Sequence, residues 1–419
     1  MELPGWKVFI FPSHIFLSDP LALFAGRLKI ICAGNLIRYP LGGFSWHHLQ
    51  YLVGFARLGH EVAYVEDYGW ADSCYDPARG DMTSDPGYGI AYLMKLLRPH
   101  SLDKSWCYLA EDGVAHGMSR QRLARLCREC DVFFNLSNIN WIPEFELCGR
   151  RALVDTDPVF TQIGGHGMSE SFDQYHVLFT YGETVHQPGC AMPTGGESWR
   201  PTRQPVALDL WPVTPGEPSA PFTTVMNWSA YSEREYEGRV YGQKDRELTP
   251  FLSLPNETGQ LMEIALNAPV DARNRLAAGG WWIADPGEVT RDPWTYQDYL
   301  QFSRAEFSVA KHAYVSARCG WFSDRSSGYL AMGRPVILQD TGFSDFLPCE
   351  KGLLAFRSPA EAVEAIQQLN NDYVAHCRAA RAVAEEFFDA RRVLTDLLER
   401  SFSLEPKESF ISLSDALKQ

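Results

Sequence analysis

The sequence has no run of about 20 apolar residues, the length that a membrane-spanning helix requires. The first 27 residues contain short apolar stretches, but prolines, a histidine and an aspartate interrupt them, and the basic start of a signal peptide is missing. The sequence therefore predicts a protein that neither crosses a membrane nor is exported. Because the first clear strand begins only at Leu28, we expect residues 1–27 to be either a loosely attached N-terminal arm or the product of a misplaced translation start.

Metal-ligand patterns are also missing. Ten cysteines are scattered along the chain, and the only close pair is Cys127 and Cys130. A zinc site needs a second pair or histidines at ligand spacing, and the sequence has neither. We therefore interpret Cys127 and Cys130 as core or surface thiols. Reduced thiols are typical of the cytoplasm, which is the expected location.

Basic charge is scarce, with 38 Lys and Arg against 52 Asp and Glu and a formal net charge of −14. A chain this acidic repels a phosphate backbone, so we expect no nucleic-acid partner. Apolar residues at 45% and charged residues at 21% are typical of a globular protein. The aromatic share of 13%, with 12 Trp, either fills large cores or lines a cleft for a sugar or another flat ligand.

The chain is longer than a single hydrophobic core usually serves, so its length predicts two domains of roughly 200 residues each. The first half contains short apolar runs typical of buried parallel strands, at residues 28–33, 61–67, 131–135, 151–155 and 176–180. Helical spacing of apolar residues covers 45–58 and 119–129. Strands that alternate with helices in this way predict a doubly wound parallel sheet.

A composition shift separates the two halves, because seven prolines fall within residues 192–221 and predict a linker. A second set of strands follows, at residues 223–228, 261–266, 281–284, 306–310, 335–339 and 353–356, with helices at 294–303 and 360–369. We therefore predict an α/β fold of two Rossmann-like domains that face each other across a cleft. The predicted parts are an N-terminal domain 28–205, a C-terminal domain 206–375, a helix 376–401 that packs on its own domain or crosses to the first, and a tail 402–419.

The second domain carries the clearest candidates for a phosphate site. Lys311 follows the strand 306–310, where it either faces a phosphate or ends a solvated strand. Lys244 is a candidate for a second cation, because a leaving diphosphate needs its negative charge stabilised. The Thr341–Gly342 loop follows another strand and can bring backbone close to a bound sugar.

A polar run that opens a helix lies between these strands. Ser323 is a good N-cap, and the residues after it, Asp324, Arg325, Ser326 and Ser327, place amides and a guanidinium where the helix dipole favours an anion. The alternative is an ordinary capped helix with an exposed arginine.

Candidates in the first domain are glycines, histidines and aspartates. Gly42 and Gly43 precede a helix and leave room for a diphosphate, and His47 and His48 follow one turn later. An imidazole near the cleft can take a proton from an acceptor hydroxyl at neutral pH.

Asp155 and Asp157, at a strand end, act as the base in place of a histidine, position the acceptor by hydrogen bonds, or only organise the turn before Pro158. Their spacing suits a metal, but they lie in the domain opposite the expected diphosphate, so we expect a metal-independent site.

Five segments resemble two-domain glycosyltransferases of the GT-B fold, and more narrowly a little-studied bacterial branch of them. These segments are PLGG at 40–43, WHHLQY at 46–51, ALVDTDPVFTQ at 152–162, AEFSVAK at 305–311 and GWFSDRS at 320–326. The likeness covers about residues 28–400. It implies a nucleotide-diphosphate-sugar donor, for example a UDP-sugar, held mainly by the second domain, and a small-molecule or glycan acceptor on the first.

One departure from the GT-B pattern concerns the sugar and ribose contacts. Many GT-B enzymes have two glutamates at the positions that Gly320 and Gly328 occupy here, and Asp324 is the nearest carboxylate. The sequence thus predicts a glycosyltransferase without a further cofactor. Two alternatives are a nucleotide-sugar epimerase of the same fold and a non-catalytic nucleotide-sugar-binding partner protein.

Overall fold

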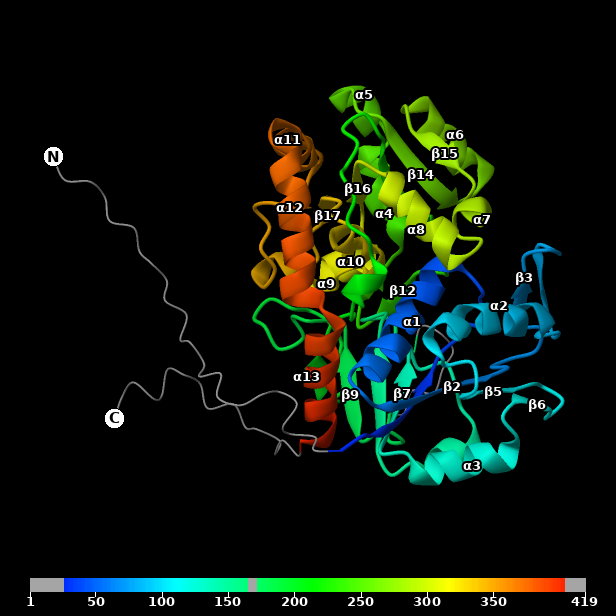
Figure 1. Ribbon diagram of the computed structural model, residues 1–419. Helices are drawn as coiled ribbons and strands as arrows, with labels where there is room; N and C mark the ends of the chain where they lie inside the picture. The colour runs from blue at the N-terminus through cyan, green and yellow to red at the C-terminus, as the bar shows by residue number, and fades with distance from the viewer. Residues whose placement is uncertain (1–25, 165–171, 404–419) are drawn as a thin grey trace, which may run out of the picture.

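The computed structural model describes residues 26–164 and 172–403, which form two α/β units stacked one above the other (Figure 1). The predicted arm 1–27 and tail 402–419 lie outside these ranges, apart from residues 26, 27, 402 and 403. Within the described ranges, no helix has both the length and the apolar character needed to cross a bilayer. All ten cysteines are described, and all are free thiols.

The lower unit in Figure 1 is built on an eight-stranded sheet of order β10-β9-β8-β7-β1-β2-β5-β6. Its strands are β1 (Lys29–Ala33), β2 (Glu61–Asp67), β5 (Trp106–Leu109), β6 (Ala115–Gly117), β7 (Val132–Leu136), β8 (Arg151–Asp155), β9 (Val177–Thr180) and β10 (Trp199–Pro201). All pairs are parallel except β5 and β6. The strand order reverses at β1, which pairs β2 on one side and β7 on the other, so the predicted doubly wound sheet is present.

Helices α1 (Gly42–Arg57), α2 (Gly87–Leu97) and α3 (Arg120–Glu129) pack in this unit. The prediction that the first helix starts near Ser45 was wrong by one turn, because the N–H of Ser45 already donates to the carbonyl of Leu41 at 2.9 Å. No element was predicted for residues 68–105, which form α2 and a small hairpin of β3 (Cys74–Asp76) and β4 (Asp81–Thr83).

The upper unit is built on a six-stranded, all-parallel sheet of order β15-β14-β11-β16-β17-β18. Its strands are β11 (Phe222–Asn227), β14 (Met262–Asn267), β15 (Trp282–Ala284), β16 (Ala305–Ser308), β17 (Val336–Gln339) and β18 (Leu353–Phe356). Numbered along the chain, the order is 3-2-1-4-5-6, the arrangement of dinucleotide-binding folds, with the switch point between β11 and β16. Both units are therefore Rossmann-like.

The helices of the upper unit are α4 (Lys244–Leu248), α5 (Leu254–Thr258), α6 (Val270–Ala278), α7 (Pro286–Val289), α8 (Pro293–Phe302), α9 (His312–Ala317), α10 (Asp324–Ala331), α11 (Pro359–Asn371) and α12 (Tyr373–Val383). A hairpin of β12 (Arg234–Tyr236) and β13 (Arg239–Tyr241) projects from it. The proline-rich segment 192–221 is not a linker throughout, because β10 lies within it as the edge strand of the lower sheet, a position that tolerates Pro201.

The C-terminal part of the chain returns to the lower unit. After α12 the helix widens into a π-turn at Ala384–Phe388 and then breaks at Asp389, so the single helix expected up to residue 401 is divided. The Asp389 carboxylate accepts the N–H of Arg391 and starts α13 (Ala390–Phe402). Helix α13 packs on α1, where Gly54 leaves room for Leu394: a Cβ at Gly54 would lie 2.4 Å from the Leu394 Cδ1 atom (Figure 1).

Helix α1 also connects the two units. The indole N–H of Trp46 donates to the carbonyl of Pro293 in α8 at 2.7 Å, and its ring packs on Trp211 with centroids 4.5 Å apart. The side-chain oxygen of Gln50 accepts from the Ala207 N–H and the Trp211 indole, both at 3.0 Å. These contacts bring the first turns of α1 next to the upper unit.

Candidate functional site

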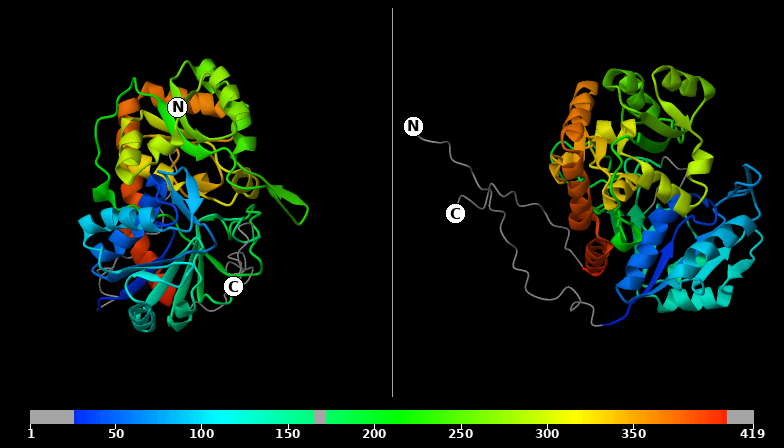
Figure 2. Two further views of the ribbon diagram at one scale, coloured as in Figure 1. Left: turned by 90° about the vertical axis from the view of Figure 1, so that its right-hand side faces the viewer. Right: turned by 45° about the horizontal axis from the view of Figure 1, so that its top comes forward.

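The carboxyl ends of the strands in the two sheets face each other where the units meet (Figure 2). Segments that follow β8 in the lower unit contact segments that follow β11 and β16 in the upper unit. Open α/β sheets bind ligands at the carboxyl ends of their strands, beside the switch point of the strand order. The candidate site is therefore this junction.

The start of α10 is an uncapped helix N-terminus at this junction. Ser323 has the extended backbone of an N-cap, but its side chain makes no capping hydrogen bond to the N–H groups of the first turn. The Ser326 hydroxyl is fully buried and has no hydrogen-bond partner within the described ranges, whereas the Ser327 hydroxyl donates to the Asp324 carbonyl at 2.7 Å. Such a helix start favours an anion.

Lys244, the first residue of α4, is an unpaired cation beside this helix start. Among the residues that the structure describes, none forms a hydrogen bond or an ion pair with its ammonium group. Burial lowers the pKa of Lys244 well below its usual value, and the positive charges of Arg325 and Lys311 lower the pKa further. A cation in these surroundings is stabilised by an incoming anion.

Arg325 has a different role from the one expected. Its Nε donates to the Glu306 carboxylate at 2.5 Å, and its two terminal nitrogens donate to the Val225 carbonyl at 2.8 Å and the Ser308 hydroxyl at 2.7 Å. Glu306 is fully buried on β16. The expectation that Arg325 grips a phosphate is therefore corrected: its guanidinium ties α10 to β11 and β16.

Asp157 bridges the two units. Its carboxylate oxygens both lie 2.8 Å from the Lys311 Nζ, and it also accepts hydrogen bonds from the hydroxyls of Tyr231 and Tyr314. The Lys311 ammonium lies over the rings of Phe160, Tyr231 and Tyr314, with 4.6 to 5.3 Å to the centroids. Lys311 thus faces the junction, but its ammonium group is already paired with the Asp157 carboxylate of the opposite unit.

Asp155 organises the turn that carries Asp157. It is fully buried, and its oxygens accept from the Asp157 N–H at 2.9 Å, the Gln162 amide at 2.8 Å and the Thr180 hydroxyl at 2.6 Å. Burial raises the pKa of Asp155, which these hydrogen bonds oppose. The geometry supports a structural role for Asp155, which is to organise the turn, and leaves no room for contact with a substrate.

The two histidines differ in what they can do. The His48 ring is saturated, because its Nδ1 donates to the Phe44 carbonyl at 2.8 Å and its Nε2 accepts the Asn35 N–H at 3.4 Å. The His47 ring has a buried Nε2 that meets no partner in the part of the chain that the structure describes, and its Nδ1 lies 3.9 Å from a carboxylate oxygen of Asp324, across the junction. Burial lowers the pKa to about 4 for His47 and about 3 for His48. His48 is corrected to a structural residue, and His47 is the candidate base.

The predicted glycine loops are occupied by the protein itself. The Gly42 N–H donates to the Thr290 carbonyl at 2.7 Å, and a Cβ on Gly42 would lie 2.6 Å from the Asp292 carbonyl oxygen. Gly43 lies beside the ring of Tyr296, with the nearest ring atom 3.7 Å from its Cβ position, which is an ordinary van der Waals contact. Gly42 thus admits the upper unit, so its assignment to a diphosphate is corrected, whereas the assignment of Gly43 stays a prediction.

The Thr341–Gly342 loop is similarly closed. The Thr341 hydroxyl donates to the Trp321 carbonyl at 2.6 Å, and the Gly342 N–H donates to the Asp340 carboxylate at 2.8 Å. Gly342 has a φ of 104°, a backbone conformation that glycine adopts readily and that residues with a Cβ atom rarely adopt. The loop therefore shapes the wall of the site and offers no open donor at these two groups.

Three residues of the junction were missed as site candidates: Tyr231, Tyr314 and Glu306. A charged residue in the fully buried strand β16 was a signal for Glu306, but nothing in the sequence marks the two tyrosines. In the described ranges, no three His, Cys, Asp or Glu side chains gather in an arrangement that could hold a metal ion.

No protein-family model matches the chain, and no curated protein matches it. Solved structures do. An alpha-glucosyltransferase in complex with UDP and a 13-mer DNA is similar with a TM-score of 0.55 and 11% identity, over 90% of this chain and 100% of that one. Anabaena HepE in complex with UDP and glucose gives a TM-score of 0.51 at 9% identity, over 89% of this chain and 99% of that one. AviGT4, a glycosyltransferase of avilamycin A biosynthesis, gives a TM-score of 0.51 at 12% identity, over 89% and 97%.

These neighbours are GT-B glycosyltransferases, and the similarity extends over almost the whole of each chain. The chain has the GT-B fold, as the sequence predicts. At this level of identity the likeness establishes the fold and not the reaction.

Proposed function

We propose that this protein is a glycosyltransferase that binds a nucleotide-diphosphate sugar at the start of α10. The observation that carries the proposal is the ammonium of Lys244, unpaired among the described residues, beside a helix N-terminus without a side-chain N-cap, at the carboxyl edge of a Rossmann-like sheet. A diphosphate supplies the negative charge that both groups lack. The solved neighbours that hold UDP support a UDP-sugar as the donor.

The transfer follows from the positions of the charged groups. An acceptor hydroxyl, bound by the lower unit, attacks the anomeric carbon of the donor sugar, and the bond from that carbon to the diphosphate oxygen breaks. His47 Nε2, which has no partner among the described residues, receives the hydroxyl proton. Lys244 and the first-turn amides of α10 stabilise the negative charge on the leaving diphosphate. Charge neutralisation by these groups supports a reaction without a metal ion.

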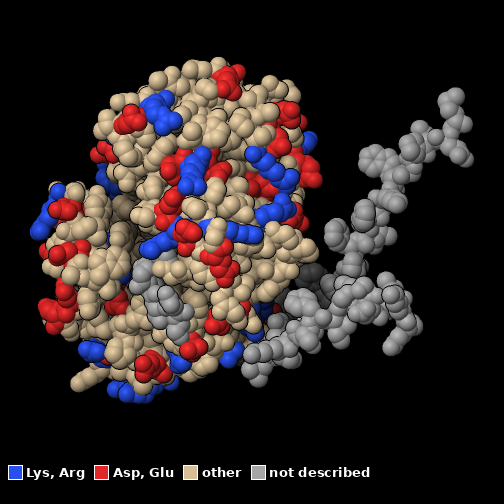
Figure 3. All heavy atoms as spheres, turned by 180° about the vertical axis from the view of Figure 1, so that it is seen from behind, with Lys and Arg blue, Asp and Glu red and all other residues tan. Residues whose placement is uncertain are grey.

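The acceptor is proposed to be a small molecule or a glycan. One structural neighbour is in complex with DNA, so the fold itself is compatible with a nucleic-acid acceptor. This chain carries a net charge of −14, and on the face in Figure 3 acidic and basic side chains are interspersed. These charges disfavour a phosphate backbone. Retention of a labelled DNA duplex at 50 mM salt would contradict this part of the proposal.

A thermal-shift screen tests the donor site. A nucleotide at a hundred times its dissociation constant raises the free energy of unfolding by about 2.7 kcal/mol. We expect UDP or a UDP-sugar to raise the melting temperature, and we expect Lys244→Gln to reduce that shift. If none of the nucleoside diphosphates or their sugars changes the melting temperature, the proposed donor site is wrong.

Turnover separates the transferase from its two alternatives. A transferase releases the nucleoside diphosphate in proportion to acceptor, whereas an epimerase interconverts nucleotide sugars without any acceptor. A non-catalytic binding partner retains the nucleotide with no product in either assay. The His47 Nε2, which meets no partner in ranges 26–164 and 172–403, is available as the proton acceptor that a transferase needs, and this favours the transferase.

A further inference from the structure

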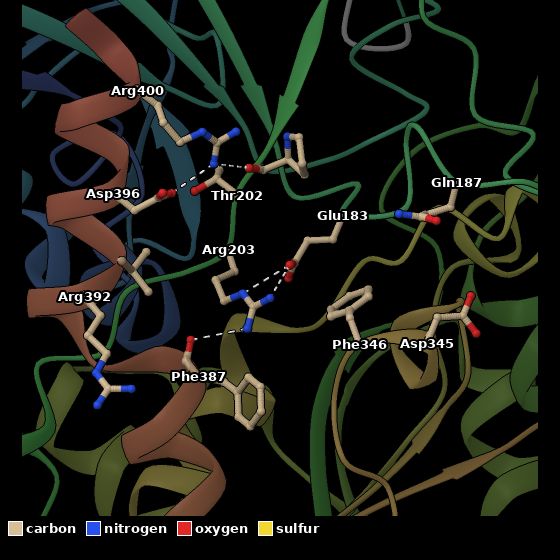
Figure 4. Close-up of a pocket in the computed structure, with 12 residues that line it drawn as sticks. Glu183, Gln187, Thr202, Arg203, Asp345, Phe346, Phe387, Arg392, Asp396 and Arg400 are labelled. Carbon is tan, nitrogen blue, oxygen red and sulfur yellow. Dashed lines mark hydrogen bonds and ion pairs between the residues drawn. The ribbon is translucent and has the colours of Figure 1, made fainter. Parts of the chain in front are cut away.

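A separate cavity of about 470 Å³ lies away from the α10 site, and Figure 4 shows the residues around it. Three parts of the chain line it: the ends of β9 and β10, the short 3-10 helix η6 (Phe343–Asp345) with the residue after it, and the crossing segment from the π-turn to α13. None of the residues assigned above to donor or acceptor chemistry lines it. The cavity touches both units and the helix that connects them.

Arginines and carboxylates alternate around this cavity. The arginines are Arg203, Arg392 and Arg400, and the carboxylates are Glu183, Asp345 and Asp396. Each carboxylate already has an arginine: Glu183 accepts from Arg203, Asp396 accepts from Arg400 at 2.9 Å, and Asp345 accepts from Arg318 at 2.6 Å.

Arg392 is the cation left over. In the described part of the chain, the one hydrogen bond of its guanidinium is to the carbonyl of Glu386, at 3.2 Å, and no carboxylate of that part pairs with it. The lining itself has three arginines and three carboxylates, but Asp345 pairs with Arg318 from outside the lining, so among the described residues Arg392 is the lining arginine that has no carboxylate. A guanidinium that is held only by a carbonyl retains donors for a carboxylate or a phosphate.

The cavity also has an aromatic wall. The Arg203 guanidinium lies 5.5 Å from the ring centroid of Phe346 and 5.8 Å from that of Phe387, and both phenylalanines line the cavity. Figure 4 shows Arg203 between Glu183 and Phe387, with Phe346 to the right of Arg203. Rings beside a guanidinium suit a ligand that is flat or apolar at one end.

Glu183 increases the preference for an anion. Burial raises the pKa of Glu183 to about 7, against the opposing effects of Arg203 and Arg400. Near neutral pH a substantial fraction of Glu183 is therefore protonated, and in that fraction Arg203 has no full counter-charge.

We infer that this cavity is a second ligand site, which takes a small organic anion with one carboxylate or phosphate group and one flat apolar part. The anionic group binds at Arg392, and the apolar part packs on Phe346 and Phe387. The ligand is distinct from the donor and acceptor of the proposed transfer.

Phenyl phosphate and benzoate are suitable probes, because they differ only in the anionic group, and benzyl alcohol is the neutral control. We expect at least one of the two anions to raise the melting temperature of the full chain, and calorimetry to give a dissociation constant. Arg392→Gln is expected to weaken that binding at least tenfold. Arg392 is exposed, so this variant should fold; Arg378→Gln, an exposed arginine on α12 outside the cavity, is the matched control.

Lys244→Gln separates this site from the donor site. Binding of the anion should persist in Lys244→Gln, and UDP binding should persist in Arg392→Gln. The inference is overturned if neither phenyl phosphate nor benzoate binds, or if benzyl alcohol binds as well as the anions do. It is also overturned if Arg392→Gln, like the control Arg378→Gln, binds the anion as tightly as the parent chain. Loss of anion binding in Lys244→Gln would place the probe at the donor site and would equally overturn it, without affecting the proposed function.

Discussion

The ammonium of Lys311 in the upper unit lies 2.8 Å from both carboxylate oxygens of Asp157 in the lower unit. Both side chains are largely buried, with 14% and 18% of their surface exposed. A buried ion pair holds its partners firmly, because each charge left alone would be costly. A donor phosphate bound by Lys311, as the sequence predicts, would compete with Asp157 for this lysine, and the contact between the units would then have to change.

Asp157→Asn tests that competition. Without the carboxylate charge, Lys311 is available to the diphosphate, so we expect UDP to bind more tightly by about 1 kcal/mol, about fivefold. The turnover number should change less than tenfold. Calorimetry with UDP and steady-state kinetics measure the two effects. A turnover number reduced a hundredfold, with unchanged UDP binding, would instead make Asp157 the base.

His47→Gln should change the turnover number and leave UDP binding nearly unchanged, the reverse of what we expect for Asp157→Asn. The substitution removes the nitrogen that receives the proton, and general-base catalysis is typically worth about a hundredfold or more in rate. We expect the turnover number to fall by that factor while UDP binding and the melting temperature change little. An unchanged turnover number would exclude His47 as the base.

The fold was predictable because it depends on patterns that the sequence repeats. Short apolar runs closed by polar residues marked β1, β7, β8 and β16, since a strand buried on both faces must be apolar along its length. The break at Asp389 was not predictable from periodicity, because it depends on the bridge that Asp389 forms with Val206, far away in the sequence. The position of α13 on α1 likewise depends on a tertiary contact at Gly54.

His48→Gln tests the structural role of the second histidine through pH. The folded pKa of about 3 lies below the unfolded value of about 6.5, so the unfolded chain binds more protons in that window. The contribution of His48 to stability is thus fully present above pH 6.5 and is lost as the pH falls towards 3. Urea denaturation of the parent chain between pH 7.5 and 4.5 should show this loss, and His48→Gln should reduce it. An equal pH slope in both would contradict the assignment.

Arg325→Met is expected to affect folding more than donor binding. The substitution leaves Glu306 buried without its ion-pair partner, and breaking a buried pair in this way typically costs about 3–5 kcal/mol. Chemical denaturation measures the loss. The double variant Arg325→Met with Glu306→Gln is the control and should recover part of the stability, since no buried charge remains alone. Normal stability with weakened UDP binding would return Arg325 to the phosphate site.

The candidate site was only partly predictable, and the reason is visible in the charged residues. Sequence position indicated that Lys244, Lys311 and Arg325 follow strands or open a helix, which places them at one edge of a sheet. Position does not say which cation already has a partner: Glu306 pairs with Arg325, and Asp157 pairs with Lys311 from the other unit. Only the three-dimensional arrangement leaves Lys244 as the unpaired cation.

Lys244→Gln is therefore the most direct test of the donor site. Lys244 has no ion pair to lose and lies near two other positive charges, so its removal should leave the free energy of unfolding unchanged or raise it. UDP binding should weaken by about 1.5–3 kcal/mol, the range for a hydrogen bond to a charged group, which is more than tenfold. Lys104→Gln, an exposed lysine of the lower unit, is the matched control.

Proton uptake gives the same lysine a second readout. Because burial lowers the pKa of Lys244, part of its population is neutral at alkaline pH, and a bound diphosphate raises the pKa again. UDP binding should then take up protons and weaken as the pH rises through the folded pKa of Lys244. Calorimetry in two buffers of different ionisation enthalpy measures the uptake, which should be absent in Lys244→Gln. Equal uptake in the parent chain and in Lys244→Gln would mean that another group titrates and that Lys244 does not contact the diphosphate.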